Sequence, residues 1–417
     1  MIITEVLPQD LFTTSDPVFN SVNGVYIKTV ATGNYSLGDS TTMGAITPTS
    51  GTYNLCFGSN AGSAISTGDY NVCFGLNSGI SVSTTNFNTF IGGIGTGSNV
   101  TSESNLGIGS YALNRFLGGN GANVAIGDSA LRGIGASTRT GYYNVAIGKS
   151  SGYAMDTGFE NTLIGYQTGV GLTSGNNNAI IGSYAGQGLT SGIANMLVGS
   201  FSGNALTTQG NNVLIGGAAG IDIKSSNNTG IGSNVLTTVV GGDGRNVAIG
   251  WSALYGSGAA TKTHAYNTGL GYQTGYLIDD GTYNIFLGPF AGYNQASSTG
   301  LFIVDAGDQD GTQRADTATE ATNAILYGVM AATPASQTLA INADTTISRD
   351  LRFTTSLDSA AVADEVSLGC YELSAGNRAL AISQESAVAA DTDETKFSHK
   401  LPVRINGATY YIMLTAT

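Results

Sequence analysis

Short apolar segments recur along most of the chain, each preceded by Asn and followed by Gly. The pattern Asn-x-x-(Ile/Leu/Phe/Val)-Gly occurs fifteen times between Asn34 and Gly288. Successive Asn residues are 17 positions apart in eight of the fourteen steps and 16, 18, 20 or 21 apart in the others. This period is too short for a helical hairpin repeat and fits one coil of a β-solenoid. We therefore expect an all-β chain with a stack of about fifteen coils.

The first Asn of each coil is expected to have a structural role. Its side chain can hydrogen-bond the backbone of a turn, it tolerates a left-handed backbone, and stacked Asn side chains can bond one another between coils. A catalytic role would break this regularity instead of repeating it. The repeat residues are Asn34, Asn54, Asn71, Asn88, Asn105, Asn123, Asn144, Asn161, Asn178, Asn195, Asn212, Asn228, Asn246, Asn267 and Asn284.

Period-two alternation assigns the apolar residues of a coil to two sides. In the Asn144 coil, Val145 and Ile147 share one side and Ala146 takes the other. We expect the residue three places after Asn to form an interior aliphatic ladder, and the residue two places after it to form an outward apolar stripe. A monomer would expose this stripe, so the pattern predicts burial between chains.

Later positions of the coil suggest a second wall. The residue seven places after Asn is small in thirteen of fifteen coils, and the next residue is usually Gly or Leu. We expect the small residues to line the opposite wall of a thin core. The Gly or Leu positions predict a second turn or a short second strand, and therefore two sheet layers per coil.

Two coils are longer than the rest. The steps from Asn123 to Asn144 and from Asn246 to Asn267 are 21 residues, with inserted loops at residues 132–140 and 255–264. Insertions in solenoids often carry binding. The spacings 18, 21 and 17 that start at Asn105 recur 123 residues later, which indicates segment duplication. Both interpretations of the loops, receptor sites or duplicated structural features, remain open here.

Composition narrows the possible functions. Charged residues make up 10% of the chain, below the roughly 25% of ordinary globular domains, which argues against helical architecture. The net charge of −13 disfavours a nucleic-acid partner, because neutralising phosphates requires clustered Lys and Arg. Three cysteines cannot form a disulfide scaffold. Cys56 and Cys73 are expected to stack on neighbouring coils as small apolar residues.

The ends of the chain suggest no membrane association. The first residues lack a basic segment followed by an apolar run, and no stretch reaches the 18 or so apolar residues of a membrane span. We expect no signal peptide and no membrane insertion. Export by another route, such as release from a lysed cell, is the corresponding expectation.

The pattern fades after Gly288. Asp305, Asp308, Asp310 and Gly311 have the oxygen ligands of a calcium loop, but lack its regular spacing and its bidentate Glu. A solvated turn is the preferred interpretation, and we expect no metal and no cofactor.

The last segment predicts a hairpin. Asn406-Gly407 separates two β-rich runs, the strongest short-range hairpin signal. It would belong to a compact β domain that covers the end of the solenoid. Tyr410 and Tyr411 are candidates for receptor contact, although adjacent strand residues face opposite sides, so at least one of them is expected in the core.

Catalytic patterns are sparse. His264 and His399 stand near no nucleophile motif. Paired carboxylates hydrolyse polysaccharides in some proteins. The chain's candidates fall in turns, where solvated charge is the ordinary state, so we expect no enzyme. These candidates are Glu160, Asp222, Asp243, Asp279 and Asp280. The regular Thr-x-Thr face of an ice-binding solenoid is also absent.

The repeat nevertheless has a recognisable form. Asn-Val-Ala-Ile-Gly, followed by a short polar step and a small residue at Asn123, Asn144 and Asn246, resembles the head repeats of trimeric autotransporter adhesins. In its longer period it more closely resembles the repeats of bacteriophage tail fibres. The segments at residues 11–20 and 326–342 look like the lead-in and connector of such fibres. The resemblance covers about 255 residues, from Asn34 to Gly288.

The resemblance implies a left-handed β-roll in a homotrimer. It divides the chain into an N-terminal attachment segment at 1–33, a β-roll at 34–300, a connector at 301–349 and a C-terminal β tip domain at 350–417. The implied function is a phage tail fibre of the virion, extracellular after host lysis. Its N-terminal part would bind tail or baseplate proteins, and its tip a host-surface glycan or protein. The alternatives are a bacterial surface adhesin or filament subunit and, less favoured, a polysaccharide-degrading tailspike.

Overall fold

The computed structural model describes most of the repeat region and parts of both ends. The described residues are 25–30, 33–39, 51–116, 119–133, 139–239, 241–256, 263–307, 311–331, 333, 336–343, 397–405 and 408–415. The chain forms two compact units, residues 1–346 and residues 347–417. Each unit is described by itself.

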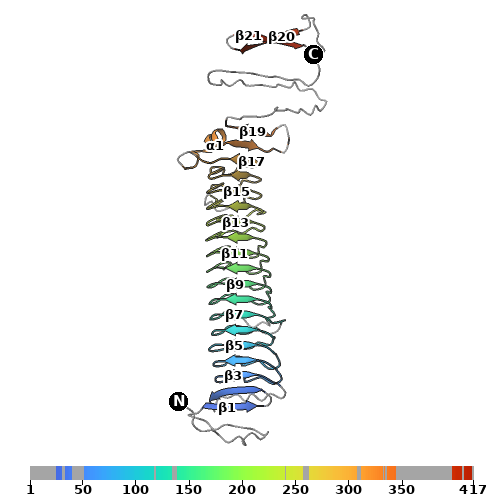
Figure 1. Ribbon diagram of the computed structural model, residues 1–417, viewed down its shortest axis with the longest axis vertical. Helices are drawn as coiled ribbons and strands as arrows, with labels where there is room; N and C mark the ends of the chain where they lie inside the picture. Colours follow the sequence, from blue (N-terminus) through green and yellow to red (C-terminus); the bar gives the residue numbers. More distant parts are fainter. Residues whose placement is uncertain are drawn as a thin grey trace. The chain divides into compact units, whose positions relative to one another are not determined.

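The first unit is a parallel β-solenoid of about fourteen turns (Figure 1). Each coil contributes one strand of three residues, which pairs in parallel with the strands before and after it. These strands are β3 (Leu55–Phe57), β4 (Val72–Phe74), β5 (Thr89–Ile91), β6 (Leu106–Ile108), β7 (Val124–Ile126), β8 (Val145–Ile147), β9 (Thr162–Ile164), β10 (Ala179–Ile181), β11 (Met196–Val198), β12 (Val213–Ile215), β13 (Thr229–Ile231), β14 (Val247–Ile249), β15 (Thr268–Leu270) and β16 (Ile285–Leu287). The predicted fold class is confirmed.

Register is constant along this sheet. Cys56 pairs with Cys73, as the spacing of the repeat predicts, and Ile147 pairs with Ile164. Longer coils keep the same register because their extra residues fall outside the strands: Val124 pairs with Val145 across a 21-residue step. The column therefore repeats the same strand surface at every level.

Antiparallel strands replace the parallel pattern at both ends of the solenoid. At the start, β1 (Val25–Val30) pairs antiparallel with β2 (Asn34–Asp39), and β2 pairs in parallel with β3. At the other end, β17 (Leu301–Val304) continues the parallel series and then pairs antiparallel with β18 (Leu326–Val329). The strand β19 (Thr338–Ile341) follows antiparallel to β18.

The segment predicted as a connector is therefore folded where it is described. Between β17 and β18 lies the short helix α1 (Thr317–Asn323), whose N-cap is Asp316. The Asp316 carboxylate accepts a hydrogen bond from the backbone N of Thr319 at 2.7 Å, which satisfies one amide of the first helical turn. Together with β18, this helix closes the C-terminal end of the solenoid core.

The inward and outward sides of the strands are the reverse of the sequence expectation. The residue two places after Asn is buried in every coil from β3 to β16, whereas its two neighbours are partly or fully exposed. Alternation shows which residues share a side but not which side faces the core. The repeat Asn decides this: it is buried, and the residue two places later lies on the same side.

The interior conserves volume by pairing two positions of a coil. In four of the six coils with Gly or Ala two places after Asn, as at Gly107 and Ala125, the residue eight places after Asn is Leu. In most coils with a larger residue there, the residue eight places after Asn is Gly. A Cβ on Gly169 would lie 3.1 Å from the Leu163 side chain, so the coil has no room for both. Ala146 goes with Gly152 instead, and the neighbouring coils fill this space: a Cβ on Gly152 would lie 2.8 Å from Leu163 and 2.9 Å from Leu131. Because the total volume of the core is kept, the core residues can differ from coil to coil while the fold stays the same.

A third wall completes the core. Eleven places after Asn, most coils carry a buried aliphatic, aromatic or Met side chain, which the sequence analysis did not single out. Its members include Ile65, Val82, Phe116, Met155, Leu172, Leu189, Leu206, Ile223, Val239 and Ile278. The small residues seven places after Asn are buried, as expected, but the Ser residues among them lie against a strand and not on the wall opposite it. Ser151 Oγ, for example, donates to the carbonyl of Leu163 in β9 at 2.9 Å.

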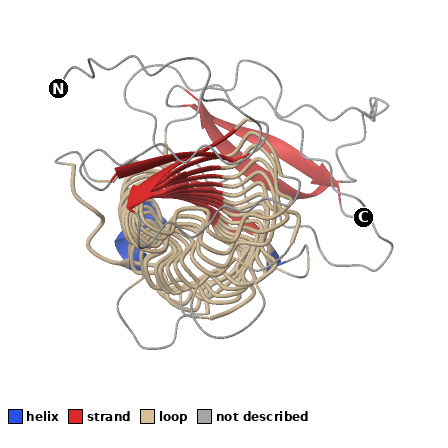
Figure 2. Ribbon diagram, turned by 90° about the horizontal axis from the view of Figure 1, so that it is seen from below, coloured by secondary structure: helices blue, strands red, loops and turns tan. Residues whose placement is uncertain are grey.

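The expectation of two sheet layers per coil is wrong in the described residues of the first unit, whose strands form one long sheet (Figure 2). The residues six and eight places after Asn have left-handed backbones, for example Tyr184 at φ 59° and Leu131 at φ 45°. Alternating positive φ values make this part of the coil a series of turns instead of a strand.

The second unit contains the predicted hairpin. The strand β20 (Phe397–Ile405) pairs antiparallel with β21 (Ala408–Thr415), and Ile405 pairs with Ala408 across the two-residue Asn406-Gly407 connection. This confirms the hairpin. The other residues of the predicted tip domain lie outside the described residues.

Candidate functional site: the exposed face of the sheet

An apolar surface runs along the outward side of the strands. It consists of the residues one and three places after each repeat Asn, from Leu55 to Leu287, and is called the sheet face below. The first of these positions is apolar in ten coils and Thr in four. The third position is always Ile, Leu, Phe or Val, and it stays exposed in several coils: Ile91 is 41% exposed and Leu270 48%. No residue of β3 to β16 is charged.

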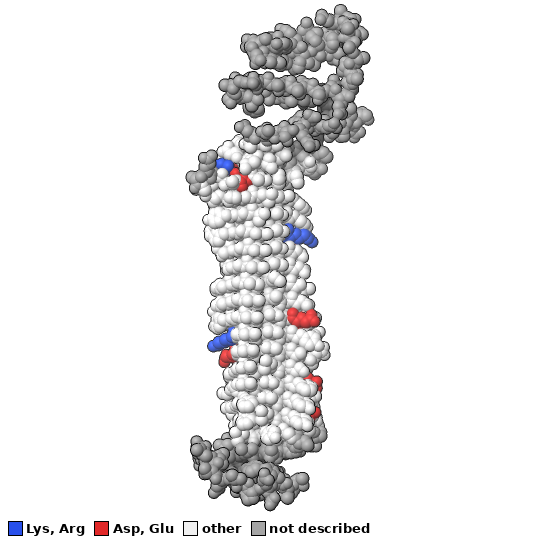
Figure 3. All heavy atoms as spheres, viewed as in Figure 1, with Lys and Arg blue, Asp and Glu red and all other residues white. Residues whose placement is uncertain are grey.

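The sheet face is large for a solvent-exposed apolar patch. Three strand residues span about 10 Å, and fourteen strands about 4.8 Å apart span roughly 67 Å, for a flat area on the order of 700 Å². The largest apolar patch on a typical monomer is about 300–600 Å². A standard interface buries about 800 Å² per partner. Charges on the view in Figure 3 are sparse, so little on that side opposes close approach.

The repeat Asn ladder gives this face a fixed shape. In each step, the side-chain Oδ1 of one Asn accepts hydrogen bonds from the backbone N and the side-chain Nδ2 of the next. For Asn178 and Asn195 these distances are 3.0 and 3.1 Å. The Asn178 Nδ2 also donates to the carbonyl of Gly192 at 2.9 Å. The backbone N of the next Asn donates to the Oδ1 of the Asn before it in all fourteen steps from Asn34 to Asn284, as the predicted ladder requires.

One detail of the Asn expectation is wrong. The left-handed residue is the one before each repeat Asn, such as Tyr53 at φ 58° and Tyr143 at φ 55°, and not the Asn itself. The ladder ends where Leu301 takes the Asn position and its backbone N donates to Asn284 Oδ1 at 2.8 Å. Each Asn thus ties one turn to the next coil and holds successive strands at a uniform spacing.

Cys56 and Cys73 lie inside the core under the sheet face. Both are free and buried, as expected for small apolar residues. A hydrogen bond with Cys56 and burial raise the pKa of the Cys73 thiol well above its ordinary value, so the thiolate is disfavoured.

The residues predicted as a receptor contact lie in the other unit. Tyr410 and Tyr411 belong to β21, where they pair with Val403 and Pro402 of β20. Their side chains lie outside what the structure describes, so the receptor role remains a prediction.

The candidate acids are dispersed over the solenoid. Glu160, Asp222 and Asp243 belong to three different coils, and only Asp279 and Asp280 share one. Asp243 lies 3.9 Å from Arg245 and accepts a hydrogen bond from the Tyr266 hydroxyl at 3.2 Å. In the described part of the chain, no three His, Cys, Asp or Glu side chains come together as a metal site would require.

Two polar residues that the sequence placed in loops are buried instead. His264 has no exposed surface, and Asp305 is 2% exposed. Asp305 is paired with Arg314, whose Nη2 lies 2.9 Å from the carboxylate, so the interpretation of Asp305 as part of a solvated turn is wrong. Asp308 and Asp310 lie outside the described residues.

A buried carboxylate near the C-terminal closure was not foreseen. Glu320 of α1 is fully buried, and its oxygens accept hydrogen bonds from the backbone N of Tyr293 at 3.1 Å and from Gln295 Nε2 at 2.7 Å. Burial raises the pKa of this carboxyl to about 7. Polar residues in a short helix with no apolar stripe gave no sequence signal for this burial.

Comparisons with known proteins add no family. No family model, no curated protein and no solved structure matches the chain. Among the described residues, no helix combines the length and apolar character of a membrane span. The chain is a β-solenoid repeat protein with an Asn ladder.

Proposed function

We propose that this chain forms a homotrimeric fibre of a phage tail, in which the solenoid is a rigid shaft that holds out a C-terminal domain for adhesion to the host surface. The observation that carries the proposal is the sheet face, which is uncharged over fourteen strands and always apolar three places after Asn. A monomer would expose this surface to water, whereas copies of the chain packed side by side would bury it.

The reversal of the two strand sides strengthens the argument for association. The residues two places after Asn vary in size and face the core, where a position in the same coil or a neighbouring coil compensates them. The outward residues three places after Asn keep one class of side chain in every coil. Contact with solvent would not require an apolar residue at the same position of every coil. An interface that makes the same contact at every coil would require it. The number three and the phage context rest on the resemblance of the repeat to phage fibre repeats.

Light scattering of the full chain tests the assembly. A trimer is expected at three times the 42.3 kDa mass of one chain. The double variant Ile147→Lys/Ile164→Lys places two charges on the sheet face and should dissociate it, because an unpaired buried charge costs several kcal/mol. The matched control Thr157→Lys/Ser174→Lys puts the same charges on exposed positions of the same two coils and should remain trimeric. A monomeric wild-type chain would sink the proposal.

Immunogold labelling tests the location. Antibodies against the solenoid are expected to decorate the tails of virions. Labelling of bacterial cells in a phage-free culture would instead favour a surface adhesin. The proposed adhesive role of the tip is tested by a chain that ends at residue 346, which should remain a trimer and lose binding to host cells. Release of reducing ends from host capsule by the intact chain would show a depolymerase.

A further inference from the structure

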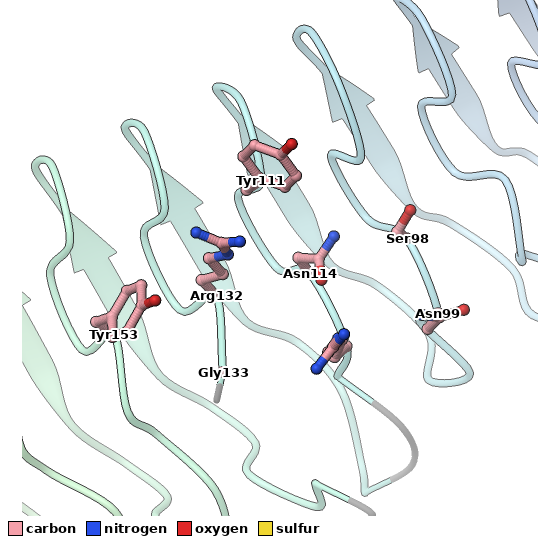
Figure 4. Close-up of a pocket in the computed structure, with 8 residues that line it drawn as sticks. Ser98, Asn99, Tyr111, Asn114, Arg132, Gly133 and Tyr153 are labelled. Atoms are coloured by element: carbon pink, nitrogen blue, oxygen red, sulfur yellow. The ribbon is translucent and has the colours of Figure 1, made fainter. Parts of the chain in front are cut away.

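A pocket of about 370 Å³ opens on the turns of the solenoid (Figure 4). It is called the arginine pocket below. Its lining comes from four successive coils, at positions six to eleven after the repeat Asn and therefore outside the strands. The lining residues are Ser98, Asn99, Tyr111, Asn114, Arg115, Arg132, Gly133 and Tyr153. Its volume falls in the range of roughly 300–1,000 Å³ that small-ligand sites occupy.

The lining is unusual for this chain. Two guanidinium groups meet two amides and two phenol rings, and none of the eight residues is acidic. The whole chain has only 15 Lys and Arg against 28 Asp and Glu. Guanidinium groups offer a planar fork of donors that matches carboxylate and phosphate oxygens. The pocket is thus a basic site on an acidic protein.

Arg132 is held in place by aromatic rings. Its guanidinium carbon lies 4.4 Å from the centre of the Tyr111 ring and 5.8 Å from that of Tyr153. Such cation–π contacts fix the orientation of the guanidinium while its N–H groups point outward in its own plane. Tyr111 and Tyr153 flank Arg132 in Figure 4, and the three residues come from successive coils.

The two amides are positioned by the backbone and a neighbouring side chain. Asn114 Nδ2 donates to the carbonyl of Gly95 at 3.0 Å, and Asn99 Oδ1 accepts from Ser81 Oγ at 2.9 Å. The Arg115 backbone N donates to the Ser98 carbonyl at 2.7 Å, which ties two sides of the pocket together. These bonds reduce the ordering that a ligand would otherwise impose.

A third guanidinium lies behind the floor. Arg139 is buried, and its Nη1 donates to the carbonyl of Met155 at 2.7 Å. Gly133 separates it from the pocket: a Cβ on Gly133 would lie 2.6 Å from Arg139 Nε. Burial lowers the pKa of Arg139, the charge of Asp156 raises it, and the charge of Arg115 lowers it. Arg139 therefore makes the electrostatic potential at the floor of the pocket more positive.

The second copy of the duplicated segment serves as an internal comparison. The backbone hydrogen bond at Gly133 is repeated 123 residues later: Gly133 N donates to Tyr153 O at 2.9 Å, and Gly256 N donates to Tyr276 O at 2.8 Å. In this copy Tyr255 stands in place of Arg132 and Thr238 in place of Arg115. Tyr255 stacks on Tyr276 with ring centres 4.9 Å apart. The backbone around Gly133 therefore does not require Arg132, whereas the left-handed backbone of Arg115, at φ 69°, is not repeated at Thr238.

We propose that the arginine pocket binds an anionic saccharide. Arg115 and Arg132 would bind its carboxylate or phosphate, Asn99 and Asn114 its hydroxyls, and the exposed part of the Tyr153 ring an apolar face of the sugar. This proposal rests on the pocket alone and holds whether or not the chain is a phage fibre. The nature of the anion, carboxylate or phosphate, is decided by the probes below.

Isothermal titration calorimetry on the full chain tests the proposal with a glucuronate-containing tetrasaccharide, glucose 6-phosphate and neutral maltotetraose. At least one anionic sugar is expected to bind at least tenfold more tightly than maltotetraose, and the one that binds identifies the anion. Inorganic phosphate and a tetraglutamate peptide are expected to bind weakly. Equal affinity for either of these would overturn the saccharide assignment, as would no binding of either anionic sugar.

Substitutions of the two lining arginines test their role in binding. Arg132→Tyr installs the residue of the second copy, and Arg115→Asn keeps a side chain that tolerates the left-handed φ of 69° at this position. The double variant Arg115→Asn/Arg132→Tyr should therefore fold with an unchanged circular dichroism spectrum and melting temperature. Sugar binding is expected to fall at least thirtyfold. Arg132→Lys keeps the charge without the planar fork and should fall about tenfold. Wild-type affinity in the double variant would place the binding elsewhere and contradict the proposal.

Discussion

Residues on the inward side of the strands range from Gly107 to Phe286, whereas the outward residue three places after Asn is Ile, Leu, Phe or Val in every coil. The inward residues vary in size because position eight of the same coil or a side chain of a neighbouring coil fills the space. The outward residue one place after Asn also varies and is Thr in four coils. Inside, the solenoid keeps the total volume constant; outside, it keeps one row of side chains apolar in every coil, which suits a surface made for packing.

The largest expected effect comes from breaking the inward ladder. Asn178→Leu removes a side chain that is buried and leaves the backbone N and Nδ2 of Asn195, the Oδ1 of Asn161 and the carbonyl of Gly192 without its bonds. Each buried unsatisfied group costs about 1–3 kcal/mol. We expect a loss of about 3–6 kcal/mol in unfolding free energy, measured by denaturant titration.

The neighbouring residue provides the control for the ladder. Asn177 is exposed and has φ 57°, which Gly adopts without strain. Asn177→Gly should change the unfolding free energy by less than about 1 kcal/mol. If the two variants lose the same unfolding free energy, the hydrogen bonds of the ladder contribute no special stability.

A smaller effect on stability is expected from a change of pH, through a buried carboxyl group at the C-terminal end of the solenoid. The Asn ladder itself is neutral and does not titrate. The pKa of Glu320 rises from an unfolded value near 4.5 to about 7 in the folded chain. Between these values the folded state binds more protons, so stability is full below pH 4.5 and is lost as the pH rises to 7. The change is up to about 3 kcal/mol.

Hydrogen exchange of β17 and β18 at pH 5 and pH 8 measures this effect, after correction for the intrinsic exchange rates. Protection should be higher at pH 5. The variant Glu320→Gln keeps a neutral hydrogen-bonding group and should remove the difference. If protection in this variant still depends on pH to the same degree, another group is responsible.

Volume compensation inside a coil predicts a coupled pair. Leu163→Ala leaves a cavity and should cost about 2–4 kcal/mol, and Gly169→Leu overpacks the same space and should cost about 1–3 kcal/mol. The double variant recreates the Ala125 and Leu131 arrangement of another coil. It should recover most of both losses, with a coupling energy of about 2 kcal/mol in a double-mutant cycle. Additive losses would contradict the compensation.

The smallest effect concerns the aromatic stack at the start of the solenoid. Tyr70 is stacked between Tyr53 and Phe87, with ring centres 5.0 and 5.2 Å away, but it is half exposed. Tyr70→Asn retains a residue that tolerates the left-handed backbone. A loss of only about 0.5–1.5 kcal/mol is expected in thermal unfolding. A loss as large as that of Asn178→Leu would make the outer stack as important as the inner ladder.

Several features could be predicted from single positions of the sequence. The period determined one coil per repeat, the chemistry of Asn determined the ladder, and Asn406-Gly407 determined the hairpin between β20 and β21. These predictions succeeded because each depends on local geometry or on a contact that recurs with the period. The repeat itself therefore determined the solenoid.

Only the tertiary structure decided which side of the strand is the core, because alternation is symmetric between the two sides. It also decided the contents of the arginine pocket, since Asn99, Tyr111, Arg132 and Tyr153 come from four different coils that only stacking brings together. The burial of Glu320 likewise depends on how α1 packs against the last coil. The physical reason is the same in each case: period and local chemistry specify a coil, whereas contacts between coils specify a site.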